Sequence, residues 1–293
     1  MTKLRSFACA VLSLALLTAT SFAAAHHFNN PRGIAVDAAG NLWVANTDGG
    51  ATGNILTFNA AYALQKTKTI TQNVDFPNSL AFDAGGYLWV SNFGNGTVVQ
   101  YANGVPTGRL VTGIQQPWQI AMDGIGNLYV LSYQQNISIY GSLEVEGALQ
   151  GPIATISQNA PYNAVGVSGG IVEIAWPGGG GTGQLQYYSA LSLLTTGMPC
   201  QPFPACFGSA GLSATPVAFA NAGENSFYMA STNGFIELFQ PAAQNFNVVT
   251  FVTYQVTAMA ADVLRQRLYV ADAADNTIYV YSTVNGALLK TIQ

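Results

Sequence analysis

Apolar and polar positions alternate along short segments of this chain, and the alternating segments come in pairs. The clearest pair runs from Pro31 to Asn46 (PRGIAVDAAGNLWVAN), where an apolar strand, an Asp/Gly turn and a second strand carrying an aromatic residue follow one another. The same order returns at Pro77 to Asn92 and at Pro117 to Ser132. A period of two is typical of half-buried strands. Self-similarity at a spacing of roughly 40–50 residues indicates a repeat fold.

Three weaker copies continue the repeat toward the C-terminus. They are Val165 to Trp176, Val217 to Ser231 and Met259 to Asp272. Two further β-rich runs follow each pair, so every unit predicts four strands. These runs include 67–70 (TKTI) in the first unit, 191–196 (LSLLTT) in the fourth and 288–293 (LLKTIQ) in the last. Six such sheets arranged radially make an all-β protein, a six-bladed β-propeller with four antiparallel strands per blade.

Aligning the six copies reveals columns of small and of aromatic residues. The first strands carry small residues at one position: Ala35, Ala81, Ala121, Gly166, Ala218 and Ala260. The second strands carry another small column (Ala45, Ser91, Ala175, Ala230, Ala271, with Leu131 as the exception) and an aromatic column (Trp43, Trp89, Tyr129, Tyr228, Tyr269). Small side chains fit strands that converge on an axis. The aromatic residues are expected to fill the wedge between neighbouring blades.

Glu173 stands in the aromatic column of the fourth copy, between Val172 and Ile174. A buried carboxylate at this position is costly unless it is partnered. Three explanations are open: Glu173 pairs with a neighbour, it lines the axial channel, or the alignment of this copy is shifted by one residue.

Repeated carboxylates in the turns raise the question of a metal site. The column consists of Asp37, Asp83, Asp123 and Asp262. An Asp at the head of a turn accepts hydrogen bonds from backbone N–H groups two residues on. One such turn per blade places the carboxylates too far apart to share an ion, so we interpret them as turn formers.

Composition changes the picture mainly at the surface. Only 8% of the residues are charged and 49% are hydrophobic, whereas an ordinary soluble domain has about 25% charged residues. Uncharged polar residues must therefore cover much of the surface. Lys and Arg number 9 and are scattered, so the basic patch of a nucleic-acid-binding protein is missing.

The first 25 residues have the features of a secretory signal peptide. Lys3 and Arg5 precede an apolar run from Phe7 to Leu17, and 22–25 (FAAA) offers a small-residue cleavage site. We therefore predict a signal peptide at 1–25, a single propeller domain at 26–293, and an extracellular or periplasmic location. The mature chain would carry seven basic and thirteen acidic side chains, a formal charge of −6. It contains no apolar run long enough for a membrane-spanning helix.

Cys200 and Cys206 are the cysteines left after the leader. In an oxidising compartment such a pair is expected to form a disulfide, here closing a small loop in a long excursion. A redox-active dithiol is the alternative, although the spacing is not C-x-x-C.

The repeat resembles the NHL family, whose unit also runs Pro, apolar strand, Asp-x-x-Gly, Leu-aromatic-Val and a polar turn. It is similar as well to the six-bladed propellers of streptogramin lyases and gluconolactonase-like enzymes, and the last copy resembles YVTN-type surface repeats. These families share a fold more than a chemistry, so the resemblance implies a shape rather than an activity.

Candidate binding residues lie where the chain enters each first strand and leaves each second strand, because these loops meet at one axial end of a propeller. The columns supply Arg32, Asn78, Trp118 and Asn163 on entering, and Asn46, Asn92, Trp176 and Asp272 on leaving. Amides and aromatic rings on a concave face suit a neutral polar ligand such as a carbohydrate or a peptide segment. The alternative is that these residues only cap loops.

Catalysis has little support in the sequence. The resemblance to streptogramin lyases implies a His, a Glu and magnesium, yet His26 and His27 precede the repeats. The resemblance to gluconolactonases implies a divalent ion that Asn46, Asn92 and Asp272 could imitate, since hard cations take oxygen ligands. Arg32, however, stands where the first acidic ligand is expected.

We therefore expect a monomeric, non-enzymatic binding or scaffold module without a cofactor. A metal-assisted lactonase or lyase, holding Ca²⁺ or Mg²⁺, is the rival hypothesis. A surface-layer or adhesive role of the YVTN kind is a third possibility.

Overall fold

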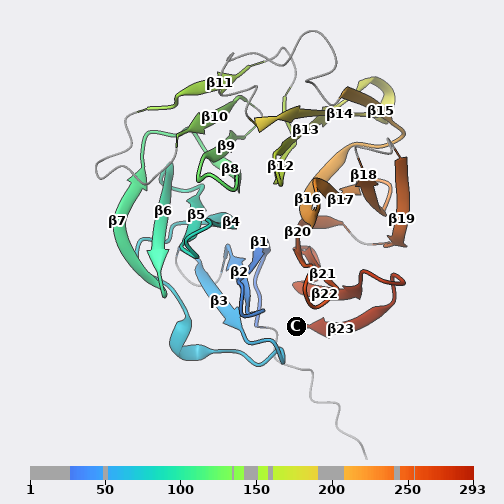
Figure 1. Ribbon diagram of the computed structural model, residues 1–293. Coiled ribbons are helices and arrows are strands. Elements are labelled where there is room, and N and C mark those ends of the chain that lie inside the picture. Colours follow the sequence, from blue (N-terminus) through green and yellow to red (C-terminus); the bar gives the residue numbers. More distant parts are fainter. Residues whose placement is uncertain are drawn as a thin grey trace, which may run out of the picture.

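The chain forms a ring of antiparallel sheets in a computed structural model that describes residues 27–48, 52–133, 135–141, 151–157, 161–190, 208–240, 245–253 and 255–293. Six sheets are arranged radially around a common axis (Figure 1) within these ranges. This confirms the six-bladed β-propeller. The predicted signal peptide, Cys200 and Cys206 lie outside the described residues, so the cleavage and the disulfide stay predictions.

Each blade, numbered 1 to 6 in chain order, uses consecutive strands from the axis outward. The innermost strands are β1 (Pro31–Val36), β4 (Pro77–Phe82), β8 (Pro117–Met122), β12 (Ala164–Ser168), β16 (Pro216–Gly223) and β20 (Val256–Asp262). The second strands are β2 (Leu42–Asn46), β5 (Leu88–Asn92), β9 (Leu128–Ser132), β13 (Ile171–Pro177), β17 (Ser226–Ser231) and β21 (Arg267–Asp272). The third strands are β3 (Asn54–Phe58), β6 (Thr97–Ala102), β10 (Ile137–Tyr140), β14 (Gly183–Ser189), β18 (Phe235–Gln240) and β22 (Thr277–Ser282).

The outer strands differ from the sequence expectation in two blades. They are β7 (Val105–Val111), β11 (Ala154–Ile156), β15 (Gly208–Leu212), β19 (Asn245–Phe251) and β23 (Leu288–Ile292). In blade 1 the segment 67–70 is not a strand: the short helix η1 (Lys66–Lys68) occupies it, and isolated bridges at Leu64 and Ile70 mark the outer edge. In blade 4 the outer strand is β15, whereas the predicted 191–196 lies outside the described residues. A second short helix, η2 (Gly179–Gly181), lies between β13 and β14.

The aromatic residues aligned in the sequence occupy equivalent positions between neighbouring blades. Trp43 pairs with Ala35 across β1 and β2, and it packs in one cluster with Leu80 and Val90 of blade 2. The other aromatic residues of the column pack in the same way against the next blade. The wedge prediction is therefore confirmed.

Blades 1 and 2 approach closely at Gly33, whose cross-strand partner is Ala45 of the second small column. A Cβ atom at Gly33 would lie only 2.7 Å from the Ser79 Cα of the next blade. In blade 5 the partner of Tyr228 is Ala220, whereas Ala218 pairs with Ala230, as Gly33 pairs with Ala45 in blade 1. The residue of the small column in that blade is thus Ala220, two positions beyond Ala218.

The ring closes by face packing of blades 1 and 6, joined by side-chain hydrogen bonds. Thr257 Oγ1 donates to the Pro31 carbonyl at 3.1 Å, and Arg267 Nη1 donates to the Ala60 carbonyl at 3.0 Å. The Arg267 guanidinium also lies over the Tyr62 ring, 5.0 Å from its centroid. Blade 6 is built from β20 to β23, so no strand is shared between the two ends.

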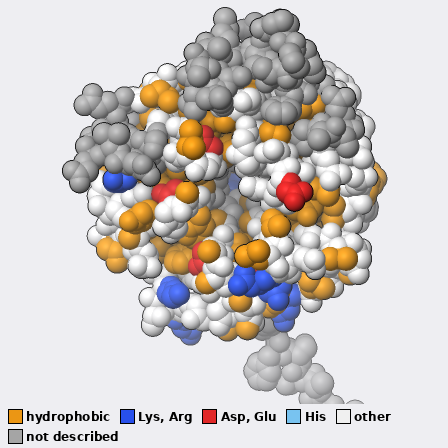
Figure 2. Space-filling model, in the orientation of Figure 1, with side chains coloured by type: hydrophobic (Ala, Val, Ile, Leu, Met, Phe, Trp, Pro, Cys, Tyr) orange, Lys and Arg blue, Asp and Glu red, His pale blue; other side chains and the backbone are white. Residues whose placement is uncertain are grey.

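Uncharged side chains cover most of the face seen in Figure 2, as the low content of charged residues predicts, and a hollow lies near its centre. The helices in the described ranges are short, and none has the length and apolar character needed to span a bilayer.

Candidate functional site

The hollow at the axis is a cavity of about 460 Å³, lined by the beginnings of the innermost strands of all six blades. Such volumes are typical of small-molecule sites. Of the eight residues predicted for the axial rim, four line the cavity: Arg32, Asn78, Trp118 and Asn163. The structure thus brings the entering column together around one space.

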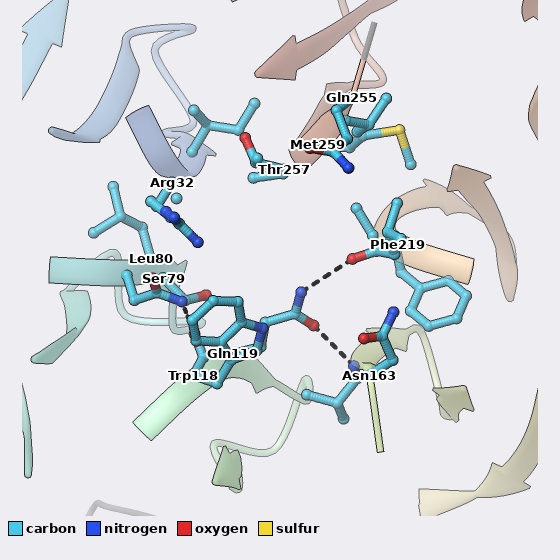
Figure 3. Close-up of a pocket in the computed structure, with 18 of the residues that line it drawn as sticks. Arg32, Ser79, Leu80, Trp118, Gln119, Asn163, Phe219, Gln255, Thr257 and Met259 are labelled. Atoms are coloured by element: carbon cyan, nitrogen blue, oxygen red, sulfur yellow. Dashed lines mark hydrogen bonds between the residues drawn. The ribbon is translucent and has the colours of Figure 1, made fainter. Parts of the chain in front are cut away.

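Arg32 is the one charged residue among the described residues that line this cavity. Its side chain is half-buried and reaches from blade 1 toward blade 3, where its guanidinium lies 5.4 Å from the centroid of the Trp118 ring. Arg32 Nε donates to Asn30 Oδ1 at 3.0 Å. Figure 3 shows the guanidinium directed into the cavity beside the indole.

Gln119 is a cavity residue that the sequence analysis did not select. Its amide extends into the cavity toward blades 4 and 5 (Figure 3). Nε2 donates to the Val217 carbonyl at 3.2 Å, and Oε1 accepts from Val165 N at 3.0 Å. One side chain of blade 3 therefore bridges blades 4 and 5.

A signal for Gln119 was present in the aligned copies. Gln119 pairs with Leu131, the exception already noted in the small column of the second strands. At the same register, the innermost strands of the other blades have Gly33, Ser79, Ala164, Ala218 and Ala258. A large polar residue in a column of small ones points into the axial space.

The amides of the entering column also tie neighbouring blades together. Asn78 Nδ2 donates to the Trp118 carbonyl at 2.6 Å, and Asn163 Nδ2 donates to the Pro216 carbonyl at 2.8 Å. These residues combine a structural role with a position on the cavity wall. The side-chain amide oxygens of Asn78 and Asn163 are acceptors, and they are the atoms suited to contact a ligand.

The leaving column does not line the cavity; its polar side chains are buried within turns. Asn46 Oδ1 accepts from Asn29 N at 2.5 Å, and Asn92 Oδ1 accepts from Asp75 N at 3.0 Å. Asp272 Oδ1 accepts from Ala274 N at 2.8 Å, and burial raises the pKa of this carboxyl.

Trp176, the remaining residue of the leaving column, packs edge-on against the buried Tyr162, with ring centroids 6.0 Å apart. It is partly buried against the core cluster between blades 3 and 4. Burial also raises the pKa of the Tyr162 hydroxyl to about 12.

The divalent-ion hypothesis finds no matching arrangement here. The oxygens of Asn46, Asn92 and Asp272 each serve a separate backbone N–H group. Within the described ranges, no three or more His, Cys, Asp and Glu side chains gather as a metal ion would need. These residues do not fit the ligand set that the gluconolactonase resemblance implies.

The Asp column has the structural role expected of it. Asp123 Oδ1 accepts from the backbone N–H groups of Ile125 at 3.1 Å and Asn127 at 2.8 Å. Its Oδ2 accepts from the Tyr129 hydroxyl at 3.2 Å. The carboxylate therefore organises the turn and also holds the wedge aromatic, a contact that the sequence analysis did not foresee.

An aromatic cluster borders the cavity on blades 2 and 3. The rings of Trp118 and Tyr133 lie 4.8 Å apart, and Phe93 contacts both, with centroids 5.9 and 6.2 Å away. Tyr133 is 37% exposed. Trp118 therefore contacts both an aromatic support and the Arg32 guanidinium.

Glu173 does not line the cavity and does not reflect a shifted alignment, because it pairs with Gly166 of the small column. It is fully buried on the side of β13 that faces blade 5, where Phe219 approaches. Both carboxyl oxygens and the Ser168 hydroxyl lack a hydrogen-bond partner among the described residues. Burial raises the pKa of Glu173 to about 8.

Comparison with known proteins supports the fold alone. No family model and no curated protein matches the chain. Among solved structures, the chain is similar to Kuenenia stuttgartiensis hydrazine synthase at a TM-score of 0.60 and 12% identity, over 88% of this chain and 97% of that one. The β-propeller domain of Myceliophteria thermophila Cps50 (Swd1) aligns at 0.59 and 9%, over 90% and 87%. A chain of the Mitotic Checkpoint Complex aligns at 0.57 and 13%, over 99% and 89%.

Proposed function

We propose that this chain is a secreted binding or scaffold module that takes a polar ligand in its axial cavity and catalyses no reaction. The observation that carries the proposal is the cavity itself: about 460 Å³, walled by all six blades, with Arg32 as the one charged residue in its described lining. General acid–base catalysis needs a group that titrates near the working pH. Arginine stays protonated, so it serves recognition.

The size of the cavity limits what enters it. A volume of this order holds a small molecule or the end of a chain, and a folded partner would have to insert a segment. The repeat resemblance to NHL propellers agrees with a scaffold whose specificity lies in residues that vary between blades. The similar solved chains belong to a synthase, to a β-propeller domain and to a checkpoint complex, and likenesses of 9–13% identity favour no particular activity here.

A ligand screen on the mature protein tests the proposal. Carbohydrates and short peptides are added, and the melting temperature and tryptophan fluorescence are measured. We expect Trp118→Ala to weaken the binding of any positive compound at least tenfold. Trp176→Ala is the matched control, because this residue is also partly buried but does not line the cavity. Equal effects of the two substitutions, or no binding compound at all, would contradict the proposal.

The rival enzyme hypothesis and the location need separate measurements. A metal-assisted lactonase predicts that Ca²⁺ or Mg²⁺ raises the melting temperature and that a lactone is hydrolysed, and both results would overturn the non-enzymatic proposal.

Fractionation of the producing cells tests secretion. We expect a shortened chain in the medium or periplasm, whereas an uncleaved chain in the cytoplasm would refute it.

A further inference from the structure

We propose that the ligand of the axial cavity carries an oxyanion, a carboxylate or a phosphate, and that Arg32 binds it. The inference rests on the proposed binding function and names the chemical class of its ligand. A half-buried guanidinium without a counter-charge has lost part of its hydration. An incoming oxyanion would restore that stabilisation.

Arg32 has no acidic partner within the described residues. The one ion pair found there joins Arg265 to Asp262 at 3.0 Å. The cavity lining contributes amides, hydroxyls and apolar groups around Arg32, and no carboxylate. The cavity therefore keeps a local positive charge inside a chain whose formal net charge is −4.

The surroundings of Arg32 orient the guanidinium without neutralising it. The Trp118 ring attracts the cation through its π face but carries no charge. Asn30 accepts from Nε and is held in turn, because its Nδ2 donates to Asp48 Oδ2 at 2.9 Å. With Nε engaged, the two terminal nitrogens have no hydrogen-bond partner among the described residues. A planar pair of N–H donors matches the two oxygens of a carboxylate or phosphate.

The rest of the cavity suits the polar body of such a ligand. Asn78 and Thr257 use their donors on backbone carbonyls of neighbouring blades, so their oxygens can accept from ligand hydroxyls. Gln255 is exposed and lines the same space. An anion with several hydroxyl groups, such as a sugar acid or a sugar phosphate, fits this combination.

Three related sugars test the inference on the mature protein. Galactose, galacturonate and galactose 6-phosphate are titrated at constant ionic strength, because salt screens exposed charges, and dissociation constants are measured by calorimetry. We expect at least one of the two anions to bind about tenfold or more tightly than galactose, as charge-assisted hydrogen bonds are about twice as strong as neutral ones. The anion that binds more tightly shows whether the oxyanion recognised by the site is a carboxylate or a phosphate.

Two substitutions assign the effect. Arg32→Gln is expected to abolish the preference for the anions, while Arg109→Gln on β7 removes the same charge outside the cavity and is expected to preserve it. Equal binding of all three sugars would overturn the oxyanion inference and leave the cavity proposal intact. Binding of none of the three overturns the oxyanion inference, and the wider ligand screen then decides whether the cavity binds anything. Equal losses in both variants would show that the effect is not local to Arg32.

Discussion

The indole Nε1 of Trp89 donates a hydrogen bond of 2.9 Å to Oδ2 of Asp83. This bond joins the aromatic residue that packs between two blades to the turn of its own hairpin. Trp43 and Asp37 make the same contact at 3.1 Å in blade 1. The turn carboxylate and the inter-blade aromatic are therefore one structural unit. This unit explains why both residues recur together in the clear copies of the repeat.

Asp83→Ala tests that unit. Asp83 Oδ1 also accepts from the backbone N–H groups of Gly85 at 3.0 Å and Tyr87 at 2.9 Å. Removing the carboxylate leaves the fully buried Trp89 with an unpaired donor, which costs about 1–3 kcal/mol, and weakens the turn as well. We expect the melting temperature to fall by about 4–8 °C, measured by calorimetry.

The control for this change is Asp48→Ala, which removes an exposed carboxylate of another loop. It is expected to shift the melting temperature by less than about 2 °C. If the two variants have the same melting temperature, the Asp–Trp pair does not contribute to the stability of the blade.

Arg267→Ala should loosen the closure of the ring. Arg267 Nη1 donates to the Ala60 carbonyl of blade 1, and its guanidinium lies over Tyr62. Since the chain ends are joined without a shared strand, these contacts carry part of the closing interaction. We expect a loss of about 1–2 kcal/mol in the free energy of unfolding, measured by denaturant titration. Lys290→Ala on the exposed side of blade 6 serves as control, and an equal loss there would contradict the role.

Gln119→Ala should open the cavity and weaken the link between blades 3, 4 and 5. Val165 N–H and the Val217 carbonyl both lose a partner, at a cost of about 1–3 kcal/mol in total, because water can replace part of the loss. Gln119→Glu is the matched variant, since a carboxylate still accepts from Val165 but cannot donate to Val217. We expect the stability order wild type, Gln119→Glu, Gln119→Ala in denaturant titrations, and equal stabilities would refute the bridge.

The repeat made the fold predictable, because the hairpins 31–46, 77–92 and 117–132 carry period-two alternation, turn residues and matching columns. The wedge role of Trp43 followed from the same columns. Where the pattern weakened, the predictions failed: the segment 67–70 is polar apart from Ile70 and forms η1 instead of a strand. In blade 5 the degenerate copy was aligned two positions short, and the residue of the small column is Ala220 instead of Ala218.

The site was only partly predictable, because a position at the end of a strand does not say which group a side chain will contact. Asn46 and Arg32 flank the same hairpin, yet Asn46 turns back to its own loop while Arg32 faces the axis. Gln119 lies in a strand of regular alternation, and in the aligned copies only its place opposite Leu131 among small residues distinguishes it. Its significance depends on the backbone groups of Val165 and Val217, which are 46 and 98 residues away.

Glu173 replaces the aromatic residue at the interface of blades 4 and 5 and places a carboxyl in an apolar setting. Its cross-strand neighbour is Tyr187, and Phe219 approaches from blade 5. Burial raises the pKa of Glu173 from 4.5 to about 8, so the folded protein holds this carboxyl protonated at neutral pH.

Glu173→Gln should therefore remove a loss of stability that develops in the wild type as the pH rises from 4.5 to about 8. Between pH 4.5 and 8 the unfolded chain has ionised Glu173 while the folded chain keeps its proton, so this group lowers stability by about 1.4 kcal/mol per pH unit as the pH rises. Below this window it contributes nothing, and above it the loss is complete. We expect the variant to gain on the wild type steadily from pH 5 to 8 in denaturant titrations. Glu224→Gln, an exposed carboxylate, should run parallel to the wild type, and a parallel profile for Glu173→Gln as well would show that Glu173 ionises normally in the folded state.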